Sequence, residues 1–507
     1  MTADEAESGW AEAELAESDV PRRVDVLIVG AGLSGIGAAV HLGMRCPRKS
    51  YAIVEAGGAI GGTWDLFRYP GIRSDSDMHT LGYMFKPWTE AKSIADGPAI
   101  LKYIRETADE YDVRRRIHFH TEVVHADWSS ESAEWIVTVR RRGKTAEIRC
   151  GFLYMNSGYY DYSQGYRPEF AGEDRFAGRI VHPQHWPEDL DHAGKRVAVI
   201  GSGATAVTLV PALAKKAAHV TMVQRSPSWI MSRPAEDRAA NFLRRWLGAK
   251  LAYRLTRIKN VWGQRFLFRR ARAEPEKIGA KLLDAARRKL GAGFDVETHL
   301  TPRYGPWEQR LCLVPDDDLF DALKAGNADM VTGEIATFTP DGLKMKDGTK
   351  VEADIVVTAT GLNLKLLGGM TLSIDGEPAR LNQTYPYKGV MFAGIPNLAS
   401  TFGYSNASWT LKADIAAIYV CRLLNEMDRR GADIALPELP PAGEFEEAPL
   451  WDLSSGYFQR AAHIMPKGTN LPPWHQPHDY VEDRKELTKN PVDDGTMIFR
   501  AAGGGTI

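Results

Sequence analysis

The sequence has few cysteines, and none of them forms a Cys-x-x-Cys pair. The four lie far apart, at Cys46, Cys150, Cys312 and Cys421. This spacing provides neither a dense disulfide framework nor a structural zinc site nor a dithiol redox centre. We therefore expect a protein of the reducing cytoplasm that binds no metal.

The sequence also lacks a long apolar run and an excess of one charge. No run approaches the roughly 20 apolar residues that a membrane-spanning helix needs. The first residues, 1–20, are rich in Asp and Glu where a signal peptide would be basic and then apolar, and they are predicted to form a disordered acidic tail. A formal net charge of -2 argues against nucleic acid as a partner.

What the chain does contain is the length and composition of a soluble, multidomain globular protein. Its 507 residues exceed what one hydrophobic core usually organises, so two or three domains are expected. Hydrophobic residues make up 44% and charged residues 25% of the chain, which is ordinary for such proteins.

The first of two βαβ units starts near the N-terminus. Residues 24–29 (VDVLIV) predict a buried strand, and the turn Gly30-Ala31-Gly32-Leu33-Ser34-Gly35 then fits the GxGxxG pattern of dinucleotide-binding folds. A second strand, residues 51–54, ends at Glu55, where a carboxylate can accept hydrogen bonds from a ribose 2′-hydroxyl. The carboxylate would repel a 2′-phosphate, so this turn suits FAD or NAD and disfavours NADP.

The second βαβ unit repeats this order of elements with a different strand end. A strand at 196–200 leads into Gly201-Ser202-Gly203-Ala204-Thr205-Ala206, where alanine in the third place is small enough for helix packing. The next strand, 219–224, is followed by Arg225 and Ser226. A guanidinium beside a hydroxyl suits a 2′-phosphate, so this turn is predicted to bind NADPH. Strand-like segments return at 330–336 and 350–358.

Between these parts lies a basic, aromatic-rich segment that favours helix. Residues 238–290 contain sixteen Lys and Arg against three Asp and Glu. The interleaved aromatic residues are Phe242, Trp246, Tyr253, Trp262, Phe266 and Phe268. We favour a helical subdomain that covers the active site with its charges in solvent; the alternative is peripheral docking on a membrane or another partner.

Two further motifs carry a family resemblance. Gly61-Gly62-Thr63-Trp64 and residues 68–75 (RYPGIRSD) resemble the flavin-proximal segment of class B flavoprotein monooxygenases. Residues 176–187 (FAGRIVHPQHWP) match the FxGxxxHxxxWP fingerprint of type I Baeyer-Villiger monooxygenases at every specified position. The fingerprint positions are Phe176, Gly178, His182, Trp186 and Pro187. The resemblance covers about residues 25–414, and several phrases are most similar to the ethionamide-activating bacterial subgroup.

The resemblance implies an FAD-containing enzyme that uses NADPH and O2. In that family NADPH reduces FAD, O2 adds to the flavin, and the C4a-peroxyflavin attacks a ketone to give an ester or lactone. Arg310 matches the family arginine that places a cation beside the developing negative charge, and Asp75 would hold that arginine. His182 is assigned to domain movement rather than to proton transfer. Sulfides and thioamides are further substrate classes.

These inferences together predict an α/β fold with two Rossmann-like dinucleotide-binding domains and a helical insertion. Residues 21–154 and 386–507 are expected to bind FAD, 155–235 and 310–385 to bind NADPH, and 236–309 to form the insertion. The predicted cofactor-binding residues are Gly30, Gly32, Ser34, Gly35, Glu55, Gly62, Thr63, Trp64, Asp65, Asp75, Val123, Gly201, Ser202, Gly203, Ala204, Thr205, Ala206, Arg225, Ser226 and Thr360.

Two departures and two alternatives accompany this interpretation. Gln309 stands where many relatives carry lysine, which leaves the strictness of the NADPH preference open, and Phe67 stands where many carry asparagine. A flavin monooxygenase that oxygenates nitrogen or sulfur would share both glycine turns, but the fingerprint and Arg310 favour the Baeyer-Villiger reaction. A flavin-dependent disulfide reductase would need a close cysteine pair, which the sequence lacks.

Overall fold

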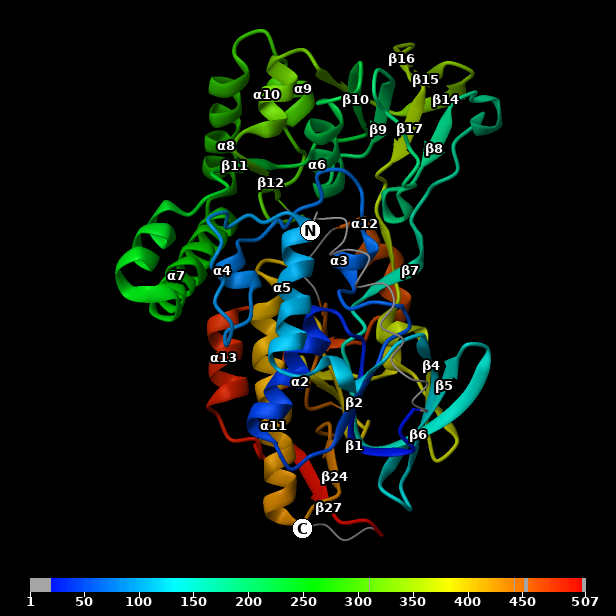
Figure 1. Cartoon of the computed structure of the whole chain (residues 1–507), viewed down its shortest axis with the longest axis vertical. Helices are drawn as coiled ribbons and strands as arrows, with labels where there is room; N and C mark the ends of the chain where they lie inside the picture. The colour runs from blue at the N-terminus through cyan, green and yellow to red at the C-terminus, as the bar shows by residue number, and fades with distance from the viewer. Residues whose placement is uncertain (1–19, 310, 442, 451–454, 504–507) are drawn as a thin grey trace, which may run out of the picture.

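The computed structural model describes residues 20–309, 311–441, 443–450 and 455–503. The predicted acidic tail lies outside these residues except for residue 20, and Arg310 lies outside them as well. The described chain forms two sheet-centred bodies, one in the lower and one in the upper half of Figure 1. The predicted α/β class with two Rossmann-like units is thus confirmed.

The lower body is built on a nine-stranded sheet. Along it run β20 (Glu377–Ala379), β19 (Thr371–Ile374), β4 (Thr121–Ser129), β5 (Glu134–Arg141), β6 (Lys144–Met155), β1 (Arg23–Val29), β2 (Tyr51–Val54) and β3 (Ile117–His118), with β23 (Leu398–Ser400) paired to β6. Strands β6, β1, β2 and β3 are mutually parallel, as in a βαβ fold. Strands β4, β5 and β6 pair antiparallel.

Residues 26–29 of β1 are all apolar because the two faces of the strand enter different cores. Val26 and Ile28 are fully buried against the helical side, whereas Leu27 faces a core that contains Trp128 and Trp135. Burying such a side chain stabilises the fold by about 1.5–3 kcal/mol. A strand covered on both faces therefore has a continuous apolar sequence rather than an alternating one.

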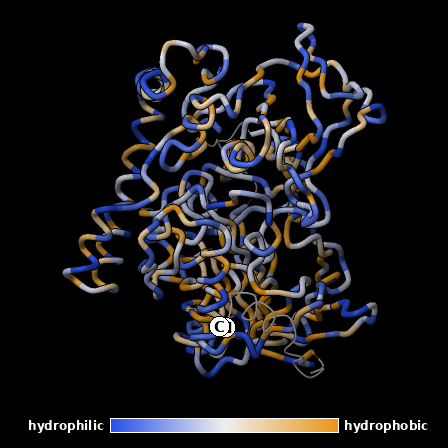
Figure 2. Tube along the Cα trace, turned by 45° about the horizontal axis from the view of Figure 1, so that its top comes forward, coloured by the Kyte–Doolittle hydropathy of each residue, from blue (hydrophilic) through white to orange (hydrophobic). Residues whose placement is uncertain are grey.

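The helices of the lower body pack mainly on one side of its sheet. These are α2 (Leu33–Arg45), α3 (Thr63–Leu66), α4 (Met78–Leu81), α5 (Gly97–Glu110), α11 (Trp409–Arg430) and α13 (Tyr480–Thr488). Helix α11 packs along α2 and α13, although hundreds of residues separate it from α2 in the chain. Figure 2 shows hydrophobic stretches in the interior of these layers and hydrophilic ones along the outer loops.

The upper body is built on a fully parallel five-stranded sheet. Its order is β13 (Ala328–Thr332), β10 (His219–Gln224), β9 (Arg196–Ile200), β17 (Ile355–Thr358) and β8 (Arg179–Val181). Val197 and Val199 face a core that the sheet shares with the helices. Ala198, on the other face, belongs to a second core that contains Phe338. The helices around it are α6 (Ala204–Leu213), α8 (Pro275–Leu290), α9 (Val296–Leu300) and α10 (Asp318–Lys324).

Two of the expected strand segments proved to be divided between sheets. Residues 350–358 form β16 (Lys350–Glu352), which belongs to a small antiparallel sheet with β14 (Ile335–Thr339) and β15 (Gly342–Met345), and then β17 of the parallel sheet. The chain changes sheet at Asp354, whose backbone and carboxylate bond to Arg196 of β9. Residues 330–336 are likewise split between β13 and β14.

The chain passes between the two main sheets twice, through β7 (Tyr160–Gly165) and β18 (Leu362–Leu364). These strands pair antiparallel with each other. Beyond the pair, Tyr166 N donates to Gly361 O at 3.0 Å and Lys365 N to Tyr159 O at 3.0 Å. The outgoing and returning segments therefore form one two-stranded connection.

The order of strands in the sheets differs in one place from the predicted division into domains. Strands β19 and β20 fall in the segment 310–385 expected to bind NADPH, yet they extend the nine-stranded sheet through β4. The helices expected in 236–309 are present as α7 (Arg238–Ala273), α8 and α9. Helix α7 bends at Gly248, whose φ is 71°, and projects at the left of Figure 1. The exact domain limits stay a prediction.

Two findings bear on the expected cellular location. All four cysteines are buried and free of disulfide bonds. Among the described helices, none is long and apolar enough to cross a membrane. The cytoplasm stays a prediction.

The remaining elements are short. They are β11 (Ile230–Arg233) with β12 (Cys312–Pro315), β21 (Pro386–Tyr387) with β22 (Met391–Phe392), β24 (Ile434–Pro437) with β27 (Met497–Arg500), β25 (Glu447–Ala448) with β26 (Gly468–Thr469), and helix α12 (Gly456–Ala461).

Candidate active site

A cavity of about 830 Å³ lies where the two bodies meet. Its walls come from both glycine turns, from α3 and residues 72–77, from β7, from α7 and from the start of α11. Segments that are far apart in the chain thus converge on one space. A cavity of this size can hold large ligands.

The first glycine turn is shaped by contacts that exclude a side chain. Gly30 has a φ of 104°, and a Cβ there would lie 2.6 Å from Asn156 O, the carbonyl that follows β6. A Cβ on Gly35 would lie 1.8 Å from Gly30 O, so only glycine lets α2 start this close to β1. No side chain caps the N-terminus of α2. Its free N–H groups can therefore receive a phosphate.

Glu55 lies at the cavity wall next to this turn. Its carboxylate accepts hydrogen bonds from Ala31 N and Gly57 N, both at 2.7 Å. Burial raises the pKa of Glu55, and the two backbone donors oppose that shift. The carboxylate is thus fixed at the end of β2, the position that contacts a ribose in dinucleotide-binding folds.

The cavity next to α3 is lined by aromatic and hydroxyl groups. Thr63 Oγ1 lies 3.3 Å from the hydroxyl of Tyr162 on β7, and burial raises the pKa of Tyr162 to about 12, which keeps it neutral. Trp409, which also lines the cavity, donates from Nε1 to Ser34 Oγ at 2.6 Å, and its ring stacks on Tyr159. These groups form a mixed apolar and polar surface around the first turn.

The second glycine turn repeats the geometry of the first. Gly201 has a φ of 142°, and a Cβ there would lie 2.3 Å from Ala359 O, the carbonyl that follows β17. Gly203 has open space around it, and α6 begins without a side-chain cap. Ala204 and Thr205 line the cavity. The turn therefore leaves room for a pyrophosphate at the start of α6.

Arg225 and Ser226 lie directly after β10, exposed to solvent. They do not line the cavity. An exposed cation at this strand end is free to meet a 2′-phosphate that extends away from the second turn.

The segment 68–75 joins the two bodies across the cavity. A Cβ on Gly71, whose φ is 78°, would lie 2.7 Å from Ala212 Cβ of α6. Arg73 is mostly buried and forms a bidentate ion pair with Asp318 at the start of α10. Asp75 lines the cavity. Its predicted contact with Arg310 stays a prediction, because Arg310 is outside the described residues.

The fingerprint segment lies beside the two-stranded connection rather than in the cavity. Phe176 packs edge-on against Phe338, and β8 then joins the edge of the parallel sheet. His182 Nδ1 accepts from Gln184 N at 3.2 Å, and burial lowers the pKa of His182. A Cβ on Gly165 of β7 would lie 1.9 Å from the His182 ring. This packing supports a role for His182 in positioning the domains.

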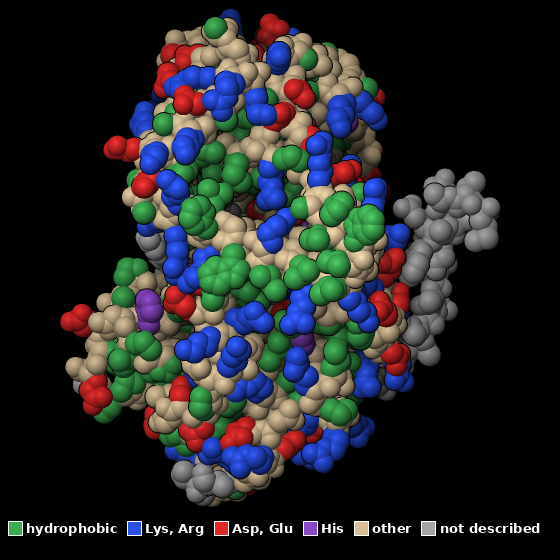
Figure 3. All heavy atoms as spheres, turned by 90° about the vertical axis from the view of Figure 1, so that its left-hand side faces the viewer, with side chains coloured by type: hydrophobic (Ala, Val, Ile, Leu, Met, Phe, Trp, Pro, Cys, Tyr) green, Lys and Arg blue, Asp and Glu red, His purple; other side chains and the backbone are tan. Residues whose placement is uncertain are grey.

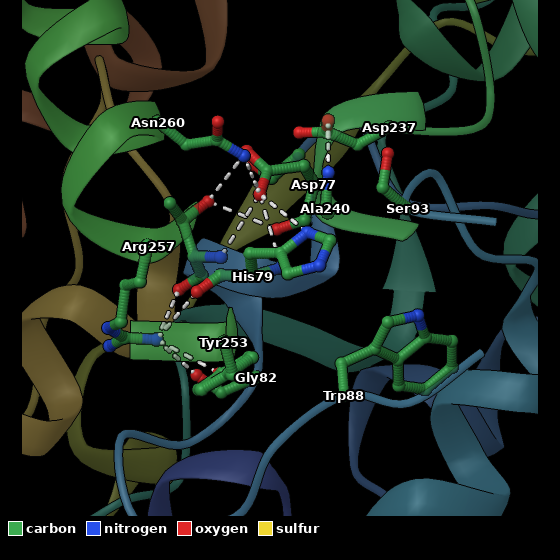
Figure 4. A network of polar contacts seen from close by, with 12 residues as sticks. Asp77, His79, Gly82, Trp88, Ser93, Asp237, Ala240, Tyr253, Arg257 and Asn260 are labelled. Carbon is green, nitrogen blue, oxygen red and sulfur yellow. Dashed lines mark hydrogen bonds and ion pairs between the residues drawn. The ribbon is translucent and has the colours of Figure 1, made fainter. Parts of the chain in front are cut away.

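Helix α7 is held to the lower body by buried polar contacts, which Figure 4 shows. Arg257 donates to Gly82 O at 2.6 Å and His79 O at 3.0 Å and forms an ion pair with Asp414 at 3.1 Å. Asp77, which is fully buried, accepts from Asn260 Nδ2 at 2.8 Å and Gln264 Nε2 at 3.0 Å. These contacts fix the face of α7 that lines the cavity.

The predicted cofactor-binding residues fall into two groups. Those that line the cavity are Gly30, Gly32, Ser34, Glu55, Gly62, Thr63, Trp64, Asp75, Val123, Ala204 and Thr205. Those that do not are Gly35, Asp65, Gly201, Ser202, Gly203, Ala206, Arg225, Ser226 and Thr360. Gly35 and Ala206 are instead packing positions. Asp65 bonds to Arg105 of α5 at 3.0 Å, and Thr360 bonds to Tyr166 O.

The sequence did not point to several residues of the cavity wall. Asn156, Tyr162, Asn260, Gln264 and Trp409 line it. Asn156 could have been found, since it follows a strand next to the first glycine turn, as Ala359 does at the second. The residues of α7 and α11 have no comparable local signal.

The comparisons with known proteins agree with this geometry. A family model described as flavin-binding monooxygenase-like matches residues 93–367, and one for an NAD(P)-binding Rossmann-like domain matches 28–92. The chain is 49% identical over 477 residues to the FAD-containing monooxygenase EthA of Mycobacterium tuberculosis, covering 94% of this chain and 97% of EthA. It is 46% identical to the probable FAD-binding monooxygenase AlmA of Acinetobacter baylyi, covering 94% and 96%.

Solved structures share the fold. A steroid monooxygenase bound to NADP superposes with a TM-score of 0.75 at 25% identity, covering 94% of this chain and all of that one. A cyclohexanone-bound cyclohexanone monooxygenase superposes with a TM-score of 0.67 at 23% identity, covering 82% and 89%. The agreement of sequence, fold and cavity leads to one assignment: the chain belongs to the flavin-binding monooxygenase-like family.

Proposed function

We propose that this oxidoreductase is an FAD-containing, NADPH- and O2-dependent Baeyer-Villiger monooxygenase that converts ketones to esters or lactones. The observation that carries the proposal is the shared cavity, on which the first residues of α2 and of α6 both open. Two dinucleotides bound at these helix starts would meet in the same space, as hydride transfer between them requires.

The first turn fits FAD and the second fits NADP. Gly30, Gly32 and Glu55 would hold the FAD pyrophosphate and ribose, with Thr63 and Trp64 beside the flavin. Gly201, Gly203 and Thr205 would hold NADP. When bound and reduced, the flavin supplies the activation of O2. The FAD of EthA and the NADP of the steroid monooxygenase structure support this assignment.

The protein side chains would stabilise the negative charge of the oxygen-transfer step and limit the access of water. Arg310 would place a cation where negative charge develops during oxygen transfer, and Asp75 at the cavity wall would orient it. Tyr162 and Trp409 would limit the access of water to the first turn. Because neutral Tyr162 can donate or accept a hydrogen bond, it suits a polar edge of the flavin.

The main alternative is a monooxygenase that oxygenates nitrogen or sulfur. Sulfide oxidation is also compatible with the Baeyer-Villiger proposal as a second activity. Product analysis separates the two. Purified yellow enzyme is incubated with NADPH, O2 and a panel of linear ketones, aryl ketones, sulfides, thioamides and tertiary amines. We expect esters from at least one ketone class. Formation of S-oxides or N-oxides alone would reject the Baeyer-Villiger proposal.

Arg225→Ala should weaken the binding of NADPH more than the binding of NADH. Loss of one charge-assisted hydrogen bond to a 2′-phosphate is expected to raise the KM for NADPH by about 10- to 100-fold and to leave that for NADH nearly unchanged. The control is Lys215→Ala, which removes an exposed cation at the far end of α6. Steady-state kinetics with both cofactors gives the comparison, and equal effects on them would remove Arg225 from the phosphate site.

A further inference from the structure

The outer face of α7 is the most apolar exposed surface of the described structure. Nine large apolar side chains are markedly exposed, and only Met44 of α2 lies elsewhere. The other eight, at 41% to 75% exposure, form what we call the apolar stripe: Phe242, Trp246, Leu247, Leu251, Leu255, Ile258, Trp262 and Phe266. Figure 3 shows green side chains gathered on this side of the molecule among blue ones.

The stripe belongs to a well-packed helix. Apart from the adjacent Trp246 and Leu247, which precede the bend at Gly248, its members recur every three or four residues, which is the spacing of one helix face. The opposite face contributes buried Tyr253, Arg257 and Asn260 to the lower body. A contiguous apolar patch on a fixed helix marks an interaction site rather than an unfinished core.

The charge of α7 identifies the chemistry of the partner. The helix contains eleven Lys and Arg and no Asp or Glu. Arg245, Lys250 and Arg254 are exposed beside the stripe and make no ion pair with any described residue. Apolar and tryptophan side chains flanked by basic ones are the pattern of a helix that lies in the interface of an anionic bilayer.

A second copy of the chain fits this surface poorly. In a two-fold dimer the same patch faces itself, so Arg245, Lys250 and Arg254 of one α7 would oppose the same cations of the other. No acidic groups on α7 are available to offset that repulsion.

We infer that α7 docks on the surface of an anionic lipid bilayer, with the apolar stripe at the headgroup boundary and the flanking Lys and Arg on lipid phosphates. The same helix lines the cavity through Lys259, Asn260, Gly263, Gln264 and Leu267. Docking would therefore place the cavity wall next to the lipid, and apolar substrates would reach the enzyme from the bilayer. The inference goes beyond the proposed reaction and does not depend on it.

Vesicle flotation of the FAD-loaded enzyme tests the inference. We expect the enzyme to float with vesicles of phosphatidylcholine and phosphatidylglycerol in equal parts, and not with phosphatidylcholine alone. High salt should weaken binding because it screens the lysines and arginines. The triple variant Trp246→Glu, Trp262→Glu, Phe266→Glu should bind at least about tenfold more weakly, and so should Arg245→Glu, Lys250→Glu.

The control is Met44→Glu, which places one carboxylate on the exposed apolar residue outside α7 and should leave binding unchanged. The yellow colour per protein and sedimentation of each variant report folding and assembly. The inference is overturned if the enzyme binds neither vesicle, binds both equally, or loses binding equally in the control. It is also overturned if the enzyme does not float but is a dimer that the stripe variants convert to monomers.

Discussion

Arg310→Ala should leave NADPH able to bleach the flavin but should nearly abolish ester formation. The proposed role of Arg310 is confined to the oxygen-transfer step, where it faces negative charge that is absent from the ground state. Removing one preorganised donor to such charge costs about 10² to 10³ in kcat. We therefore expect ketone turnover to fall by at least that factor while NADPH is still oxidised and O2 is reduced to hydrogen peroxide.

The measurement needs two comparisons. Arg310→Lys keeps a cation and should recover part of the turnover, whereas Arg303→Ala removes an exposed arginine seven residues earlier in the sequence that does not line the cavity and should change little. Flavin reduction is followed by absorbance without O2, and ester by product analysis. Unchanged ketone turnover in Arg310→Ala would refute its assigned role.

Arg257→Ala should be strongly destabilising. Its side chain is buried and supplies hydrogen bonds to three carbonyls of the segment around α4 as well as the ion pair with Asp414. Alanine would leave Asp414 buried, with His41 as its remaining side-chain partner. Breaking one partner of a buried pair costs about 3–5 kcal/mol, because an uncompensated charge stays in the interior.

Arg254→Ala is the matched control for that change. Arg254 lies three residues earlier on α7, is exposed, and makes no ion pair with any described residue. We expect a change in unfolding free energy within about 0.5 kcal/mol for it. Urea midpoints with FAD in excess give both values. Similar midpoints for the two variants would show that the polar contacts of α7 add little to stability.

The sequence predicted the two βαβ units well because local signals determine them. The apolar runs of β1 and β9 face two cores each, and the glycine turns are enforced by the carbonyls of Asn156 and Ala359. The same local reasoning found strands over residues 350–358 but not their division between two sheets. The alternation from residue 350 runs on into the apolar residues 355–357 and conceals the change of sheet at Asp354, which depends on Arg196 of another strand.

The walls of the cavity could not be predicted in the same way. Trp409 bonds to Ser34 although 375 residues separate them in sequence, and no local pattern near either residue predicts the contact. For α7, composition gave the basic and aromatic character, but which side chains face water depends on tertiary packing around Asp77 and Asp414. Long-range contacts of this kind follow from the whole fold.

The pairing of β7 with β18 limits how the two bodies can move. A single linking chain would let one body swivel freely against the other, because rotation about single bonds costs little. Two hydrogen-bonded strands resist torsion, since twisting one would break its bonds to the other. The connection therefore resists twisting of one body against the other more than tilting, and the ion pair of Arg73 with Asp318 adds a second tie between the two bodies.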